Sequence, residues 1–116
     1  MTPDGSALLM LALVSGEFGA DAADYIRSRL RRPRISANSA MGGGFPEGTV
    51  FESKFGSAYD TLAEIVHAEL PDARRLIIAG FSNGRDPEGP DEQDPSALAA
   101  FAALLLEQLS SAQAVP

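Results

Sequence analysis

The last helix expected from the sequence carries apolar side chains on more than one face, and this most limits how the chain can fold. Asp94 and Pro95 supply an N-cap and a first-turn proline, so a helix is expected from about residue 95 to residue 111. One apolar stripe of this helix consists of Leu98, Phe101, Ala102, Leu105 and Leu109. Leu104 and Leu106 lie off that stripe, and a domain of 116 residues buries only about two-thirds of its unfolded surface. The helix therefore predicts an interface with a second copy of the chain or with a protein partner.

The rest of the chain alternates between predicted helices and strands. Helices are expected over residues 3–15, 21–31 and 57–70. Strands are expected over residues 34–37, 49–54 and 76–81. The apolar run 7–14 also fits a buried strand, because periodicity does not separate the two structures over so short a run. We expect an α+β fold: a two-layer single domain over residues 1–116, with about four helices packed on a two- to three-stranded sheet, or a small α/β domain as the alternative.

Two connecting segments are expected to be loops. Residues 36–48 are rich in glycine and include Gly42, Gly43 and Gly44, which favours a flexible surface loop. Residues 83–94 have almost no apolar content and are rich in glycine, proline and acids, which favours a mobile acidic loop. That acidic loop lacks the residue order of an EF-hand, so no calcium site is expected in it.

Charge and composition exclude several partners and sites. The chain has 9 basic and 16 acidic residues, and its net charge of -7 disfavours non-specific binding to nucleic acid. The longest apolar run is much shorter than the ~20 residues that cross a bilayer, and Asp4 precedes it where a signal peptide has basic residues. We therefore expect a cytoplasmic protein without membrane contact. The chain has no cysteine and 1 histidine, which excludes disulfides, thiol nucleophiles and sites that need two imidazoles from one chain.

Five of the basic residues are arginines within eight positions: Arg27, Arg29, Arg31, Arg32 and Arg34. Arginine suits bidentate binding of carboxylates and phosphates, so the cluster is a candidate partner or anion site beside the glycine-rich loop. The same arginines also complement the negative end of the preceding helix, which requires no ligand. No aromatic side chains are interleaved with them, so nucleic acid is an unlikely partner.

One short motif points to nucleophilic catalysis. Gly80-Phe81-Ser82-Asn83-Gly84 matches the G-x-S-x-G pattern and follows a predicted strand, as a nucleophile elbow does. No helix is expected directly after Ser82, and the single histidine, His67, precedes the serine instead of following it. A Ser-Asn-Gly turn explains the motif with fewer assumptions, so Ser82 and His67 are weak catalytic candidates.

A second constellation resembles a metal site in its spacing. On the expected helix 57–70, Asp60, Glu64 and His67 would share one face, and Glu-x-x-His is the spacing of carboxylate-bridged metal sites in helical bundles. Such sites need a second helix of the same kind, which this chain lacks. A solvated charged face is the simpler interpretation, so no metal is expected and these residues are weak candidates only.

These features favour a small acidic, non-enzymatic interaction or assembly domain that self-associates or docks a protein partner through its apolar C-terminal helix. The expected contact residues are the five arginines together with Leu98, Phe101, Leu104, Leu105, Leu106 and Leu109. The alternatives are a small serine hydrolase using Ser82, or a module that binds a phosphate- or nucleotide-type anion through Arg27–Arg34. No cofactor is expected, and the balance of the motifs is against an enzyme without excluding one.

Overall fold

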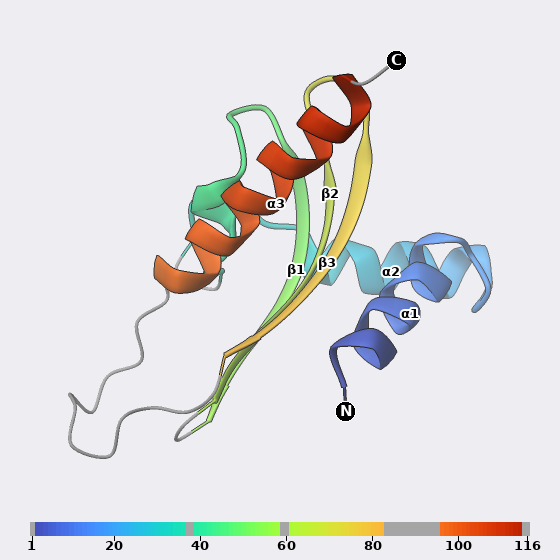
Figure 1. Ribbon diagram of the computed structural model, residues 1–116. Helices are drawn as coiled ribbons and strands as arrows, with labels where there is room; N and C mark the ends of the chain where they lie inside the picture. Colours follow the sequence, from blue (N-terminus) through green and yellow to red (C-terminus); the bar gives the residue numbers. More distant parts are fainter. Residues whose placement is uncertain (1, 37–38, 59–60, 83–95, 115–116) are drawn as a thin grey trace.

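The computed structural model describes residues 2–36, 39–58, 61–82 and 96–114. This part of the chain contains three α-helices and three β-strands, so the predicted α+β class is confirmed. The strands form one antiparallel sheet in the order β1-β2-β3 (Figure 1). The helices are α1 (Pro3–Val14), α2 (Ala20–Leu30) and α3 (Ser96–Ala114), and the strands are β1 (Val50–Ala58), β2 (Thr61–Glu69) and β3 (Arg75–Ser82).

The two N-terminal helices form where the sequence predicts them. Thr2 caps α1 by accepting a hydrogen bond from the Gly5 amide at 3.0 Å, and Pro3 occupies the first turn, where its missing amide hydrogen costs nothing. The alternative of a buried strand over residues 7–14 is therefore wrong. α2 ends at Leu30, within one residue of the expected boundary, and Arg31 leaves it in an extended conformation.

The helix expected over residues 57–70 is wrong, because this stretch forms the end of β1 and the whole of β2. The side chains of β2 alternate: Leu62, Glu64 and Val66 are buried, while their neighbours Thr61, Ala63 and Ile65 are only partly buried. A glutamate at one of the buried positions hides this period of two from an analysis of apolar residues alone. This one error also explains why the sequence predicts about four helices.

The helices cover both faces of the sheet. α1 and α2 lie on one face, α1 against β2 and β3 and α2 against β1, while α3 lies across the other face (Figure 1). The strand expected at 76–81 is confirmed as β3, and its two faces are covered as its continuous apolar sequence predicts. Within the described strands β3 is nevertheless an edge strand, not a central one.

The main core lies between the sheet and α3. Its fully or almost fully buried members include Met41, Phe51, Val66 and Ala102. A smaller core under α1 and α2 contains Met10, Leu13 and Ala23, with Ile65 and Ile77 of the sheet packed against them. Because side chains alternate along a strand, β2 and β3 contribute to both cores.

The glycine-rich segment differs from the expected surface loop. Gly42–Gly44 form a short 3₁₀-helix, and α3 packs directly on it. The Met41 side chain beside it is fully buried. The possible strand at 34–37 is absent over the described residues 34–36, and residues 37–38 lie outside the described part, as does the predicted acidic loop at 83–94.

Glycine allows α3 to approach this segment closely at position 44 but is not required at the neighbouring position 43. A Cβ atom on Gly44 would lie 2.3 Å from the Ala99 carbonyl oxygen, whereas a Cβ atom on Gly43 would lie 4.0 Å from the nearest atom. We expect Gly44→Ala to lower the free energy of unfolding by about 1–3 kcal/mol, as overpacking does, and Gly43→Ala to change it little. Urea denaturation of both variants measures this difference, and equal stability of the two would contradict the close packing of α3.

Candidate functional site

A buried carboxylate on β1 joins α2 to the sheet. The Glu52 side chain is 1% exposed and accepts hydrogen bonds from Arg27 Nε at 3.0 and 3.1 Å and from Arg27 Nη2 at 3.0 Å. Arg31, which directly follows α2, places its Nη2 atom 3.8 Å from Glu52 Oε2. The pairing has the forked geometry in which arginine holds a carboxylate most firmly.

The network continues across the other two strands. His67 Nδ1 lies 2.7 Å from Glu52 Oε1, and Arg75 Nε donates to His67 Nε2 at 3.2 Å. Because Nε2 accepts a hydrogen bond, the hydrogen-bond network assigns the ring proton to Nδ1, which donates to Glu52. The chain Arg27–Glu52–His67–Arg75 therefore links α2 to all three strands.

The ion pair shifts the pKa values of both partners. Burial raises the pKa of Glu52, but hydrogen bonds from Arg27 and His67 outweigh burial and hold the pKa below its usual value. The hydrogen bond to Glu52 is the main reason why the pKa of Arg27 lies above its usual value. A carboxyl group whose pKa is lowered by folding stabilises the folded state above its unfolded pKa, and this stabilisation is lost as the pH falls.

We therefore expect acid to weaken the fold through Glu52. The free energy of unfolding of the wild type should fall as the pH is lowered from about 5 through the lowered pKa of Glu52. Glu52→Gln should lose about 3 kcal/mol at pH 7, because Arg27 keeps its charge without a partner, and should show a flatter dependence on pH in the acid range. Urea titrations at a series of pH values test both parts, and parallel pH profiles of variant and wild type would show that Glu52 does not carry the effect.

A second buried carboxylate, on the other face of the sheet, fixes the segment that leads into β1. Glu64 is fully buried, and its Oε1 atom accepts hydrogen bonds from the amides of Ala40 at 2.9 Å and Met41 at 2.6 Å. Its Oε2 atom accepts from the hydroxyls of Ser39 and Ser53, both at 2.5 Å. Four donors satisfy the carboxylate completely, so Glu64 is a structural anchor that leaves no oxygen free for a ligand.

One Glu64 oxygen accepts from two backbone amides and the other from two hydroxyls, and this difference predicts the effects of substitution. In Glu64→Gln the amide oxygen can still accept from the two backbone amides, and the two hydroxyls can rotate to accept from the new NH2 group. We expect this variant to lose about 1–2 kcal/mol, the difference between charged and neutral hydrogen bonds, and Glu64→Leu to lose more than about 3 kcal/mol because four buried donors become unsatisfied. Chemical denaturation measures the order, and a leucine variant as stable as the glutamine variant would disprove the role of the four donors.

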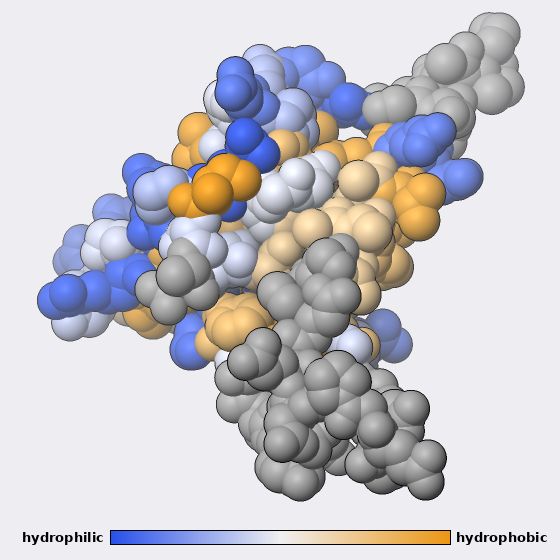
Figure 2. Space-filling view, turned by 90° about the vertical axis from the view of Figure 1, so that its left-hand side faces the viewer, coloured by the Kyte–Doolittle hydropathy of each residue, from blue (hydrophilic) through white to orange (hydrophobic). Residues whose placement is uncertain are grey.

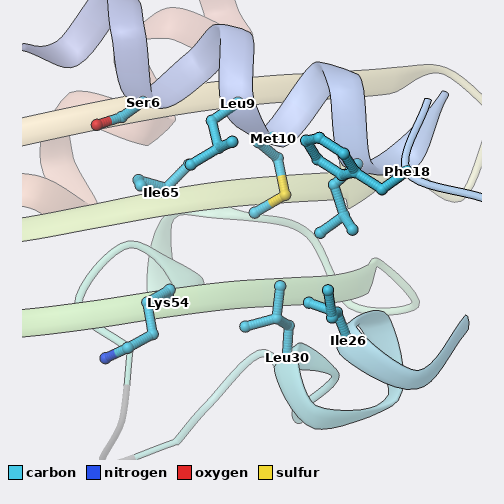
Figure 3. A pocket seen from close by; sticks show the side chains of 9 residues that line it. Ser6, Leu9, Met10, Phe18, Ile26, Leu30, Lys54 and Ile65 are labelled. Carbon is cyan, nitrogen blue, oxygen red and sulfur yellow. The ribbon is translucent and has the colours of Figure 1, made fainter. Parts of the chain in front are cut away.

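An apolar pocket of about 250 Å³ lies between α1, α2, β1 and β2. Leu9, Met10 and Leu13 line it from α1, and Ile26 and Leu30 line it from α2. Figure 3 shows Ser6 and Lys54 towards one end of this pocket and Phe18 and Ile26 towards the other. Lys54 belongs to β1 and extends its ammonium group away from the apolar lining (Figure 3).

The structure separates the two weak catalytic candidates. Ser82 pairs with Leu62, whereas His67 pairs with Ile77, five positions away along β3. This offset corresponds to about 17 Å of strand and places the two side chains on opposite faces of the sheet. His67 also uses both ring nitrogens within the Glu52 network, so it cannot serve Ser82 as a base.

The metal-site candidates are also separated. Glu64 and His67 are three positions apart on a strand, not on a helix, and therefore point to opposite faces. Asp60 lies outside the described residues. Over the described part of the chain no group of histidine, aspartate and glutamate side chains forms a metal-binding cluster.

The five arginines of the predicted cluster have different surroundings, although Arg27 and Arg31 both approach Glu52. Arg27 is bound to Glu52, and the Arg29 guanidinium lies 5.3 Å from the Tyr25 ring centre. Arg32 donates to the Leu30 carbonyl oxygen at 3.1 Å, and the Arg31 side chain is 61% exposed. Arg34 is partly buried, and its carbonyl oxygen lies close to Gly42.

The C-terminal helix divides its apolar residues between core and surface. Leu98 and Ala102 are buried, while Leu105 and Leu106 are half-buried against the main core. The helix also has exposed apolar side chains, Phe101, Leu104 and Leu109, and Figure 2 shows an apolar band along this side of the molecule. Leu104 is thus exposed as expected, whereas Leu106 is partly covered by the same chain.

Sequence reasoning missed the buried Glu52, assigned Glu64 to a solvated face instead of the core, and gave no role to Lys54. A signal was present for each. Glu52 stands in a run of strand-forming residues where a charge is costly, and Lys54 is the only lysine of the chain. The wrong helix at 57–70 concealed that Glu64 and Lys54 lie on neighbouring strands.

Comparisons with known proteins connect this fold to larger ones. No family model matches the chain. The chain is 35% identical over 111 residues to golvesin of Dictyostelium discoideum, a match that covers 94% of this chain and 19% of golvesin. The chain thus spans about a fifth of that relative.

Solved structures of two β-lactamases and of PBP-A share its fold. The match to a β-lactamase from Burkholderia ambifaria has a TM-score of 0.75 at 18% identity and covers 94% of this chain and 41% of that one. A halotolerant bacterial β-lactamase gives a TM-score of 0.76 at 21% identity over 94% of this chain and 42% of that one. PBP-A gives 0.71 at 18% identity over 90% of this chain and 38% of that one. At these identities the likeness establishes the fold, and the chain spans about two-fifths of each of these structures.

These matches overturn the function expected from the C-terminal helix. The non-enzymatic interaction domain is wrong, because the structures that share this fold over nine-tenths of the chain are β-lactamases and PBP-A. The exposed leucine and phenylalanine side chains of α3 do not by themselves define a function. None of the helices in the described residues has the length and apolarity that a bilayer crossing requires.

Proposed function

We propose that this chain forms the sheet-containing α+β part of a serine hydrolase that acts through an acyl-enzyme. The observation that carries the proposal is its fold, which is similar over 90–94% of the chain to β-lactamases and to PBP-A. One structure of a PBP-A variant is an acyl-enzyme complex with penicillin G. These similarities favour a serine hydrolase, the alternative raised in the sequence analysis, but not Ser82 as its nucleophile.

The strand β1 supplies a second supporting observation. Class A β-lactamases and penicillin-binding proteins use the motifs S-x-x-K, S-D-N and K-T-G. Lys54-Phe55-Gly56 on β1 agrees with the first and third positions of K-T-G. Phe55 stands where that motif has threonine, so this chain lacks the hydroxyl group of the middle position. Lys54 would contribute a positive charge that orients a substrate and stabilises developing negative charge.

The position of Lys54 suits this role. β1 is an edge strand, and its only bridge beyond the sheet in the described residues joins Glu52 to Arg31 near its start. Lys54 is exposed and has no carboxylate partner among the described residues. A lysine held on a rigid strand with an accessible side is well placed to meet a substrate or a facing catalytic group.

The nucleophile of the proposed reaction lies outside these 116 residues. Lys54 is the only lysine, and Phe51 stands three positions before it, so the sequence contains no Ser-x-x-Lys motif. The S-D-N motif is also absent from the sequence. Because the chain spans about two-fifths of the structures it resembles, we propose that further polypeptide supplies the serine and its lysine.

Covalent labelling tests the proposed function. We expect a fluorescent penicillin or a fluorophosphonate to label the polypeptide that carries this segment on a serine of a Ser-x-x-Lys motif, and peptide mapping identifies that serine. Lys54→Met should slow labelling about 100-fold, the usual effect of removing one electrostatic group from an acyl-transfer site. Arg74→Met is the matched control and should leave the rate unchanged, because Arg74 directly precedes β3, at the other edge of the sheet from β1, and pairs with Asp72. Labelling of Ser82, or no labelling by either reagent, would refute the proposal.

A further inference from the structure

The pocket between α1, α2 and the sheet is built to hold an apolar group. Its lining consists mainly of aliphatic, methionine and phenylalanine side chains from α1, α2, β2 and the turn between the two helices, and its volume is about 250 Å³. A protein cavity of about 150 Å³ lined by leucine, isoleucine and phenylalanine is enough to bind benzene, which has six non-hydrogen atoms. By the same ratio this pocket accommodates about ten.

Polar groups lie at one end of this pocket only. Ser6 lines the pocket from α1, is fully buried, and has no hydrogen-bond partner for its Oγ atom in the described structure. This hydroxyl points away from the other lining side chains (Figure 3) and has no accessible surface, so it does not meet a ligand in the pocket. Lys54 lies towards the same end (Figure 3) and places a positive charge there.

The ammonium group of Lys54 retains capacity for a ligand. Lys54 Nζ donates to the Phe55 carbonyl oxygen at 2.6 Å, which uses one of its three protons. Its hydrocarbon stem lines the pocket while its charge extends towards solvent, the usual arrangement of a lysine at an apolar rim. An anionic group at this end of the pocket would therefore meet a cation at the rim.

We infer that this pocket binds the apolar chain of a medium-chain carboxylate, with its carboxylate group beside Lys54. A saturated carboxylate of eight carbons has ten non-hydrogen atoms and matches the volume. A carboxylate is the product that water releases from an acyl-enzyme, so as the product site of the reaction proposed above this inference rests on the proposed function. As a binding site, it is tested on the 116-residue chain alone, without any catalytic step.

Titration with octanoate followed by ¹H–¹⁵N NMR provides the test. We expect saturable shifts confined to the pocket-lining segments of α1 and α2 and to Lys54 and Ile65, with a Kd of about 1 mM or below. Butanoate should bind at least about tenfold more weakly, because burial of each methylene group contributes to affinity. Dodecanoate should bind no more tightly than octanoate, because about eight carbons already fill the pocket.

Three variants separate the charge, the hydroxyl and the apolar pocket. Lys54→Met keeps the length of the side chain without its charge and should weaken octanoate about two- to fivefold while leaving octan-1-ol unchanged. Ser6→Ala should leave octanoate binding unchanged, because the Ser6 Oγ atom has no accessible surface in the pocket. Ile26→Trp fills the far end of the pocket from a residue that is 39% exposed, and should abolish binding of both ligands. Ile35→Trp, at an exposed position that does not line the pocket, is the matched control and should bind like the wild type.

The outcomes distinguish this inference from the proposed function. Shifts that are linear in octanoate concentration, or that spread over the exposed side of α3, would overturn the inference while leaving covalent labelling untouched. Equal weakening of octanoate and octan-1-ol by Lys54→Met would overturn the placement of the carboxylate. Failure of the labelling experiment together with saturable octanoate binding would refute the hydrolase and keep the binding site. Circular dichroism of each variant confirms that the fold is retained before its binding is compared.

Discussion

The buried carboxyl group of Glu64 holds together parts of the chain that are far apart in sequence. Its two oxygens receive two backbone amides from residues 40–41 and two hydroxyls, one of them from β1. These contacts fix the segment that crosses from α2 to β1, and this segment carries the 3₁₀-helix on which α3 rests. The main core therefore depends on a polar anchor as well as on apolar packing, because the buried donors have no alternative partner in a dry interior.

The opposite face depends on a different kind of contact. There Glu52 joins Arg27 of α2 to His67 and Arg75 of the sheet, and the apolar contribution comes from a small cluster under α1. The two faces thus use two acidic residues in different ways: Glu64 is satisfied by uncharged donors, and Glu52 by arginine and histidine. Both are buried, which is unusual for glutamate and is tolerated because each is fully paired.

The sequence predicts those elements whose ends and periodicity agree, such as α1 with its Thr2-Pro3 start and the apolar strand β3. It fails at β2, where a buried Glu64 breaks the alternation of apolar residues and a helical spacing fits by chance. That failure carries over to the site, because a strand places Glu64 and His67 on opposite faces where a helix would place them together. Lys54 stands out in the sequence as the single lysine, but the role proposed for it depends on the neighbours that the fold gives it.

Successive residues of β1 are tied to opposite sides of the molecule. Glu52 is bound to α2 through Arg27, and Ser53 is bound through Glu64 to the segment beneath α3. The backbone directly before Lys54 is therefore held by contacts on both faces of the sheet. The Cα position of Lys54 is fixed as a result, and only its side-chain torsions remain free. A cation delivered in this way needs little reorganisation when a negative charge forms beside it, which is the condition under which a fixed charge is most effective.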